Sequence, residues 1–134
     1  DYISSIISVV TKEGLTDRFH LIGPISENEK SWYYQNCTAF AHPSLAEGFG
    51  LPVLEAMSLG KPVFCSNRTS LPEIGKEFAF YWETFTQENM VRVFEEGMKR
   101  ANDKHWEVAI RSHAHQFCWR KAARSYLSIY QELL

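Results

Sequence analysis

The first apolar residues of the chain recur at the spacing of one helical face. They are Ile3, Ile6, Ile7 and Val10. Residues three and four positions apart lie on the same side of an α-helix, so the pattern predicts a helix over 2–13 that Gly14 ends. The apolar run Phe19–Ile22 that follows has the length and composition of a short strand.

A second helix is predicted from polar residues. Ser26 precedes Glu29 by three positions, which is the spacing of a capping box, so a helix is expected from there to about Asn36. The turn Gly23-Pro24 separates this helix from the preceding apolar run.

Three more apolar runs predict strands, at 39–42, 62–65 and 79–82. A helix with Pro52 in its first turn and Gly60 after its last residue separates the first two, and a short helical turn near Pro72 precedes the third. Strands separated by helices pair in parallel through right-handed crossovers. The sequence therefore predicts an α/β fold, a Rossmann-like doubly wound parallel sheet of about four strands.

A helical C-terminal tail is expected after the last strand. Thr86 and Asp103 are predicted N-caps of helices that run to about Ala101 and Phe117. The segment 119–134 predicts a last helix with an aromatic side, formed by Trp119, Tyr126 and Tyr130. We expect this side to pack back across the domain as core, or to be an interface with a further domain.

Composition narrows the class of protein. The chain of 134 residues has room for one domain, 1–134, and its 45% apolar and 14% aromatic residues exclude disorder. A net charge of -2 gives no reason to expect nucleic acid or an anionic membrane as partner. Three separated cysteines without a CxxC pair are expected to be small buried thiols in a reducing compartment, which favours a cytoplasmic location.

Candidate chemistry is concentrated between Glu47 and Gly75. Glu47 and Glu55 lie eight positions apart, around a turn with glycines at 48 and 50 that leads directly into a helix. A helix N-terminus presents unpaired N–H groups and the positive end of the peptide dipole, so the amides of Phe49, Gly50 and Leu51 are candidate phosphate contacts. The glycines are expected to allow special backbone conformations and a close approach.

The two carboxylates would repel phosphate, so their natural partners are the hydroxyl groups of a nucleotide sugar. Other interpretations remain open. Glu47 would then be a loop carboxylate in water, Glu55 part of a solvated helix face, and the glycines an ordinary turn. A glycosidase site is disfavoured. In a glycosidase the two carboxyl groups lie about 5 Å or about 6.5 to 9.5 Å apart and face the same glycosidic bond, whereas here a candidate phosphate-binding turn separates Glu47 from Glu55.

Three segments occur in an order that is typical of one family: FHLIGPIS followed by Glu27, AFAHPSLAEGFGLPVLEAMSLGKPVFCSN, and LPEIG. The chain resembles the C-terminal, donor-binding half of retaining glycosyltransferases of the GT-B fold, glycosyltransferase family 4, group 1. The resemblance is close over about 15–84 and loose over the helical tail. It includes the E-x7-E motif, Glu47 to Glu55, in which every residue between the two glutamates fits the family's pattern.

The resemblance implies a hexosyltransferase domain of polysaccharide biosynthesis that binds a nucleoside-diphosphate sugar. It assigns Glu55 to the ribose hydroxyls, and Glu47 to the donor hexose hydroxyls and to charge developing at the anomeric carbon; for Glu47 we favour binding. The turn Gly23, Pro24 and Ile25 would bracket the nucleobase. The donor-binding candidates are thus Gly23, Pro24, Ile25, Ser44, Gly48, Phe49, Gly50, Leu51 and Glu55, with Glu47 as the catalytic candidate.

No cofactor and no metal is implied, because the family neutralises diphosphate with a helix end and a basic Arg and Lys pair. That pair, the first strands and the acceptor domain would precede Asp1, so weak nucleotide binding and no transfer are expected of the chain alone.

The missing first strand would be central in the family's sheet. We therefore expect Phe19–Ile22 to pair directly with 39–42, or a second molecule to fill the gap as a homodimer. If the full-length enzyme associates with a membrane, this segment is not expected to anchor it, because no apolar run approaches the roughly 18 residues of a membrane span.

Two other functional classes remain. One is a non-catalytic nucleotide-binding module, and the other is a GT-B phosphorylase or epimerase. His42 either packs at the edge of its strand or lines the site. His113 and His115 point to different faces of a predicted helix and make a poor metal pair.

Overall fold

The computed structural model describes residues 1–133, and contacts divide the chain into two compact units, Asp1–Ser31 and the chain from Trp32 onward. Each unit is described by itself. In the first, helix α1 spans Tyr2–Lys12, as predicted. The Asp1 carboxylate accepts a hydrogen bond from the Ile3 amide at 3.3 Å, and Gly14 follows the helix with a φ of +67°.

Helix α2, Glu27–Asn36, begins in the first unit with the predicted capping box. The Ser26 amide donates to Glu29 Oε2 at 2.8 Å, and the Glu29 amide donates to Ser26 Oγ at 3.3 Å. Two backbone donors at the helix start are therefore satisfied by local side chains, which explains why the sequence alone locates this helix.

The predicted strand at Phe19–Ile22 is wrong. The segment has no strand or helix conformation, and Phe19, Leu21 and Ile22 are exposed. Its expected direct pairing with 39–42 is wrong as well, because the sheet of the described residues contains three other strands only. An apolar run favours a strand only when a neighbouring strand can accept its backbone hydrogen bonds.

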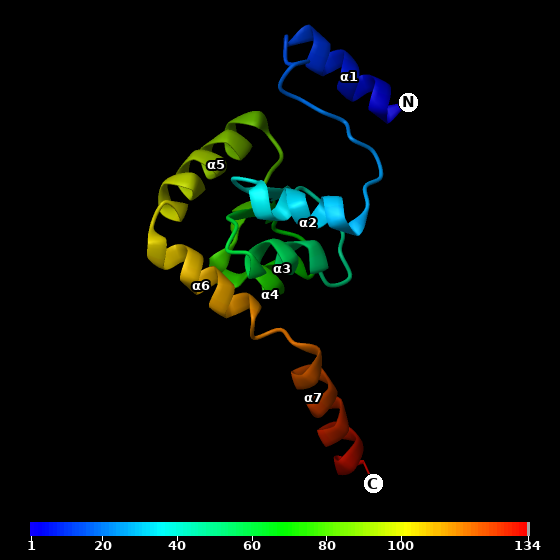
Figure 1. Ribbon diagram of the computed structural model, residues 1–134, viewed down its shortest axis with the longest axis vertical. Coiled ribbons are helices and arrows are strands. Elements are labelled where there is room, and N and C mark those ends of the chain that lie inside the picture. Colours follow the sequence, from blue (N-terminus) through cyan, green and yellow to red (C-terminus); the bar gives the residue numbers. More distant parts are fainter. Residues whose placement is uncertain (134) are drawn as a thin grey trace. The chain divides into compact units, whose positions relative to one another are not determined.

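The second unit is built on a parallel sheet in the order β1-β2-β3, namely Phe40–His42, Val63–Ser66 and Phe80–Trp82. Figure 1 draws this part of the chain in cyan to green. Phe40 pairs with Val63 in the first ladder, and Phe64 pairs with Phe80 in the second. The α/β Rossmann-like fold is confirmed with three strands where about four were expected.

Alternate side chains of the central strand β2 enter two packed layers. Val63 and Cys65 belong to the core that also contains residues of α3 (Leu51–Ser58), α4 (Leu71–Gly75) and α6 (Lys104–Ala114). Phe64 points the other way, stacks on Phe80 at 5.0 Å between ring centroids, and lies 4.9 Å from the ring of Phe94 in α5 (Gln87–Ala101). The short 3₁₀ helix η1, Lys76–Phe78, connects α4 to β3. Helices thus cover both faces, as in a doubly wound sheet.

Gly97 allows α5 to lie close against the sheet. A Cβ at this position would be 2.5 Å from Phe64 Cε1 and 2.7 Å from Phe80 Cγ. Both distances are far below van der Waals contact, so this helix position admits no side chain without a shift of two packed rings.

The caps of the tail helices are confirmed, but the end of α6 differs from expectation. Thr86 Oγ1 accepts from the Asn89 amide, and Asp103 Oδ1 accepts from the His105 amide. Helix α6 ends at Ala114 rather than near Phe117.

The last helix, α7, spans Trp119–Glu132 and has no buried residue. Its predicted packing as core is wrong, since Trp119, Tyr126 and Tyr130 are exposed. The aromatic pattern correctly predicts an amphipathic helix, but the described chain supplies no surface that buries it.

The cysteines also differ from expectation. All three are free thiols, but Cys65 alone is buried, while Cys37 is partly buried and Cys118 is exposed. Burial raises the pKa of the Cys65 thiol to about 12. Small apolar side chains are buried where the fold has room for them, and the sequence does not say which positions these are.

Candidate functional site

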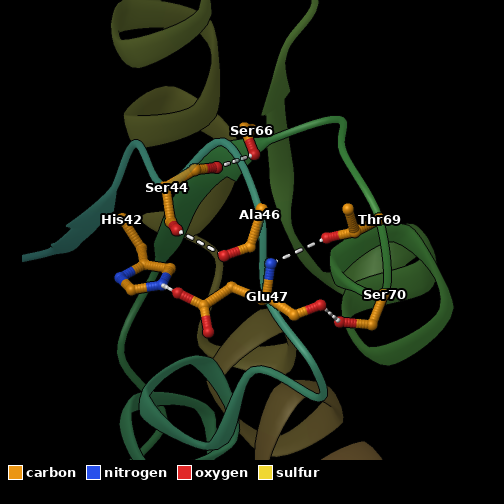
Figure 2. A network of polar contacts seen from close by, with 7 residues as sticks. All are labelled: His42, Ser44, Ala46, Glu47, Ser66, Thr69 and Ser70. Carbon is orange, nitrogen blue, oxygen red and sulfur yellow. Dashed lines mark hydrogen bonds and ion pairs between the residues drawn. The ribbon is translucent and has the colours of Figure 1, made fainter.

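The candidate site lies where β1 and β2 end. Because the strands are parallel, the loop after β1 and the loop after β2 meet at the same edge of the sheet. Ser66 Oγ, at the end of β2, donates a hydrogen bond to the carbonyl oxygen of Ser44 in the β1 loop (Figure 2). The end of one strand is thereby tied to the loop that follows its neighbour.

Glu47 is fixed to the second loop through its backbone. Its amide donates to Thr69 Oγ1 at 3.0 Å, and its carbonyl oxygen accepts from Ser70 Oγ at 3.1 Å (Figure 2). Thr69 has a φ of +50°, in the left-handed region that non-glycine residues rarely adopt. The candidate catalytic residue is therefore held at both ends of its backbone by residues more than 20 positions away.

The Glu47 carboxylate faces the end of β1. Its Oε1 lies 2.8 Å from His42 Nε2, and the two side chains are 25% and 19% exposed (Figure 2). The Ser44 hydroxyl and then the His42 imidazole hold the pKa of Glu47 below its ordinary value. Glu47 is accordingly ionised near neutral pH and acts as a hydrogen-bond acceptor.

His42 takes both of the roles that the sequence left open. Its ring stacks on Phe40 with 5.7 Å between centroids, and it also contacts Glu47. It packs at the end of the strand and lines the candidate site at once.

Gly50 begins helix α3 in the left-handed conformation, with a φ of +100°. A Cβ there would lie 2.8 Å from Leu71 Cδ2 of α4, so both the special conformation and the close approach expected at this position are found. Within residues 1–133, no hydrogen bond is recorded for the amides of Phe49, Gly50 and Leu51. These three donors stand at the positive end of an eight-residue helix.

Gly48 differs from Gly50, against expectation. It does not have a positive φ, and a Cβ at this position would meet nothing within 4 Å. The packing of the chain itself therefore does not require glycine at 48, although it does at 50.

Glu55 lies on α3, one helical turn after Leu51 and on the same side of the helix. Its side chain is partly buried, and its carbonyl oxygen accepts from Ser58 Oγ at 2.7 Å. Phe49 is exposed, and its ring packs edge to face against Phe117 at 6.3 Å. The sequence-predicted residues of the 44–55 segment thus share one loop and the helix that it enters.

The predicted nucleobase turn belongs to the first unit. Gly23 has a φ of +66°, as the turn requires, and Ile25 is exposed. The assignment of Gly23, Pro24 and Ile25 to the nucleobase stays a prediction.

The side chains that hold the loop in place were not predicted from the sequence. Ser66, Thr69 and Ser70 are ordinary polar residues after a predicted strand, and the one available signal was their position at the carboxyl end of that strand. Among residues 1–133, no group of three or more His, Cys, Asp or Glu residues is placed to hold a metal ion. The helices of the described chain are all too short or too polar to cross a membrane.

The amino-acid sequence matches a known protein family over most of its length. Residues 4–105 match the family described as Glycosyl transferases group 1. O-antigen chain mannosyltransferase B of Escherichia coli is 42% identical over 74 residues, which cover 55% of this chain and 19% of that protein. The serotype-specific mannosyltransferase WbdA of Escherichia coli is 33% identical over 141 aligned residues, which cover 100% of this chain and 17% of that protein.

A third relative is the O-antigen chain mannosyltransferase RfbU of Salmonella typhimurium, which is 33% identical over 81 residues, or 60% of this chain and 23% of that protein. The matched segments span 17% to 23% of the length of these relatives. Its fold corresponds to half of a GT-B fold. By the match over 4–105, the chain belongs to the group 1 family of glycosyl transferases.

Proposed function

We propose that this chain binds a nucleoside-diphosphate hexose and forms the donor-binding part of a retaining hexosyltransferase of polysaccharide biosynthesis. The observation that carries the proposal is the placement of an ionised Glu47 at the sheet edge, in the loop that delivers Gly50 to the start of α3. A site of this kind offers donors for an anion and an acceptor for hydroxyl groups within one short loop.

The diphosphate would bind at the start of α3. The amides of Phe49, Gly50 and Leu51 have no recorded hydrogen bond within the described chain, and the helix dipole favours negative charge there. Gly48 leaves open space beside these amides, since nothing lies within 4 Å of its missing Cβ. A phosphate oxygen can therefore approach the backbone beside Gly48 without displacing another part of this chain. Phe49 and Leu51 are exposed, whereas Gly50 is buried.

The donor hexose would bind at Glu47. An ionised carboxylate accepts hydrogen bonds from sugar hydroxyls and stabilises positive charge that develops at the anomeric carbon. Its backbone bonds to Thr69 and Ser70 keep it in place before the donor arrives. Retention of configuration and the contact of Glu55 with the ribose hydroxyls enter the proposal through the family resemblance.

We propose mannose as the transferred sugar, because the three relatives described above are all named mannosyltransferases. The acceptor would be held by another domain, as the GT-B resemblance implies. No metal or cofactor has a part in the proposed step.

The test is calorimetric or NMR titration of the chain with UDP, GDP and ADP and with their hexose conjugates. One nucleotide should bind, and its hexose conjugate should bind more tightly. Glu47→Gln should lower affinity for the conjugate by roughly tenfold or more, because a hydrogen bond to a charged group contributes about 1.5 to 3 kcal/mol. The same change should leave affinity for the bare nucleotide within about twofold.

Glu55→Gln is the matched variant, and it should weaken nucleotide and conjugate equally through the ribose. Glu96→Gln, on the exposed surface of α5, should change neither affinity. Failure of every nucleotide to bind, or a conjugate affinity that does not respond to Glu47→Gln, would overturn the proposal. Hydrolysis of an aryl glycoside that disappears in the Glu47→Gln variant would replace it with a glycosidase.

A further inference from the structure

We infer that His42 is a positioning residue that holds the Glu47 carboxylate in the orientation in which it receives the donor hexose. The inference rests on the proposed function. It adds a residue that lies outside the E-x7-E motif and whose role the sequence left open between packing and site lining.

The imidazole is itself well fixed. His42 is the last residue of β1 and pairs with Cys65 in the ladder to the central strand β2. Its ring stacks on Phe40 with an angle of 18° between the planes. A ring that is held by a strand and by an aromatic neighbour has few orientations, so its Nε2 marks a defined point at the sheet edge.

Glu47 reaches that point from a backbone that is also fixed. Thr69 and Ser70 hold its amide and its carbonyl oxygen, and His42 Nε2 lies 2.8 Å from Oε1 (Figure 2). Only the side-chain torsions of Glu47 remain free, and the bond to His42, together with the Ser44 hydroxyl, selects among them. A glutamate without this bond would sample several rotamers and would pay conformational entropy when it binds a sugar.

The direction of the hydrogen bond follows from charge. An ionised carboxylate oxygen accepts hydrogen bonds, so Nε2 must carry the proton, in the neutral imidazole or in the imidazolium. Ser44 is the other side chain that lowers the pKa of Glu47, and it does not titrate in the range of interest. Thr69 and Ser70, from the neighbouring loop, do not titrate there either. Glu47 is therefore the group at this edge whose pKa the neighbouring side chains lower.

Two substitutions separate positioning from packing. His42→Phe keeps an aromatic ring against Phe40 but removes the donor, whereas His42→Gln places an amide N–H near the position of Nε2. The measured quantity is the ratio of the dissociation constant of the nucleoside diphosphate to that of its hexose conjugate. This ratio isolates the contribution of the sugar.

We expect His42→Phe to lower the ratio by roughly tenfold, with affinity for the bare nucleoside diphosphate within about twofold of the parent. His42→Gln should restore most of the ratio. The ratio should fall at low pH as Glu47 is protonated. In His42→Phe this fall should occur at higher pH, because the pKa of Glu47 rises when a hydrogen-bond donor is removed. If His42 only packed, its substitution would change neither the ratio nor the pH at which the ratio falls.

A measurement on the unaltered chain covers the case in which a variant fails to fold. With ¹⁵N-labelled histidine, the Nε2 resonance of His42 should move on addition of the hexose conjugate and stay in place on addition of the nucleoside diphosphate alone. An unmoved resonance with bound conjugate would overturn the inference.

The outcomes distinguish this inference from the proposed function. If the unaltered chain binds the hexose conjugate no more tightly than the nucleoside diphosphate, the proposed function itself is contradicted. If the unaltered chain and His42→Phe gain the same affinity from the hexose, the proposed function stands and the role of His42 is overturned.

Discussion

Two helices of the second unit have similar amphipathic sequences, but only one of them is buried against the rest of the unit. Helix α6 buries Trp106, Ile110 and Ala114 against the helices on one side of the sheet, whereas helix α7 buries none of its residues. Both form from local signals, because helix periodicity and termination are encoded within a few turns. Burial, however, requires a surface on another element. The comparison shows that periodicity predicts a face and leaves its partner undetermined.

The largest loss of stability is expected for a substitution in the sheet, and the matched substitution in α7 should have almost no effect. Phe64→Ala should reduce the free energy of unfolding by about 3 to 5 kcal/mol, because the fully buried ring leaves a cavity between the sheet and α5. Tyr126→Ala, on the exposed face of α7, should change it by no more than about 0.5 kcal/mol. Urea denaturation of both variants measures the two values. Equal losses would mean that α7 has a buried partner after all.

Gly97→Ala tests the close packing of α5. Alanine favours a helix over glycine by about 1 kcal/mol, but here its Cβ would meet Phe64 and Phe80 at less than 3 Å. Overpacking should win, with a net loss of about 1 to 3 kcal/mol in urea denaturation. Ser128→Ala in exposed α7 is the control and should be neutral or slightly stabilising. A stabilised Gly97→Ala variant would show that the two rings yield easily.

The two loop glycines sharpen the same contrast within the candidate site. Gly50→Ala should cost about 1 to 2 kcal/mol of stability, because a left-handed φ strains any residue with a Cβ. Gly48→Ala should leave the melting temperature unchanged, since its Cβ meets nothing, and should weaken nucleoside-diphosphate binding. Thermal melting and titration with the nucleotide measure the two effects. A Gly48→Ala variant with undiminished affinity would remove this residue from the proposed phosphate seat.

The smallest effect on stability is expected for alkylation of Cys118. The exposed thiol should react with iodoacetamide near pH 8 and leave the free energy of unfolding within about 0.5 kcal/mol of the untreated protein. Cys65 should stay unmodified until the chain unfolds, because it is buried and its pKa is raised to about 12, so that thiolate is scarce. Peptide mass mapping after timed labelling separates the sites. Early modification of Cys65 would contradict its burial.

The parts of the fold that have local causes could be predicted from the sequence. The capping box at Ser26 and Glu29, the N-caps Thr86 and Asp103, and the helix after Gly50 all depend on residues within one turn of each other. The three strands of the sheet were also located, because buried parallel strands are nearly continuous apolar runs. The strand at Phe19–Ile22 was not, since an apolar run forms a strand only beside a partner.

The site was predictable as a segment and not as a network. The E-x7-E spacing and the glycines pointed to residues 44–55. The side chains that bind the backbone of this loop, Ser66 at Ser44 and Thr69 and Ser70 at Glu47, come from the end of another strand. Contacts between residues 22 or 23 positions apart depend on strand order and register, which polar residues in a loop do not encode.

The hydrogen bonds between the β1 loop and the β2 loop have a consequence for binding rates and selectivity. Ser66, Thr69 and Ser70 connect the two loops before any ligand is present, so the acceptor carboxylate and the amides of α3 belong to one preorganised element. A ligand that meets a preorganised element loses little affinity to loop ordering. It must also fit the existing spacing between phosphate seat and carboxylate, which favours molecules in which an anion and a hydroxyl-bearing ring are separated by a fixed number of bonds.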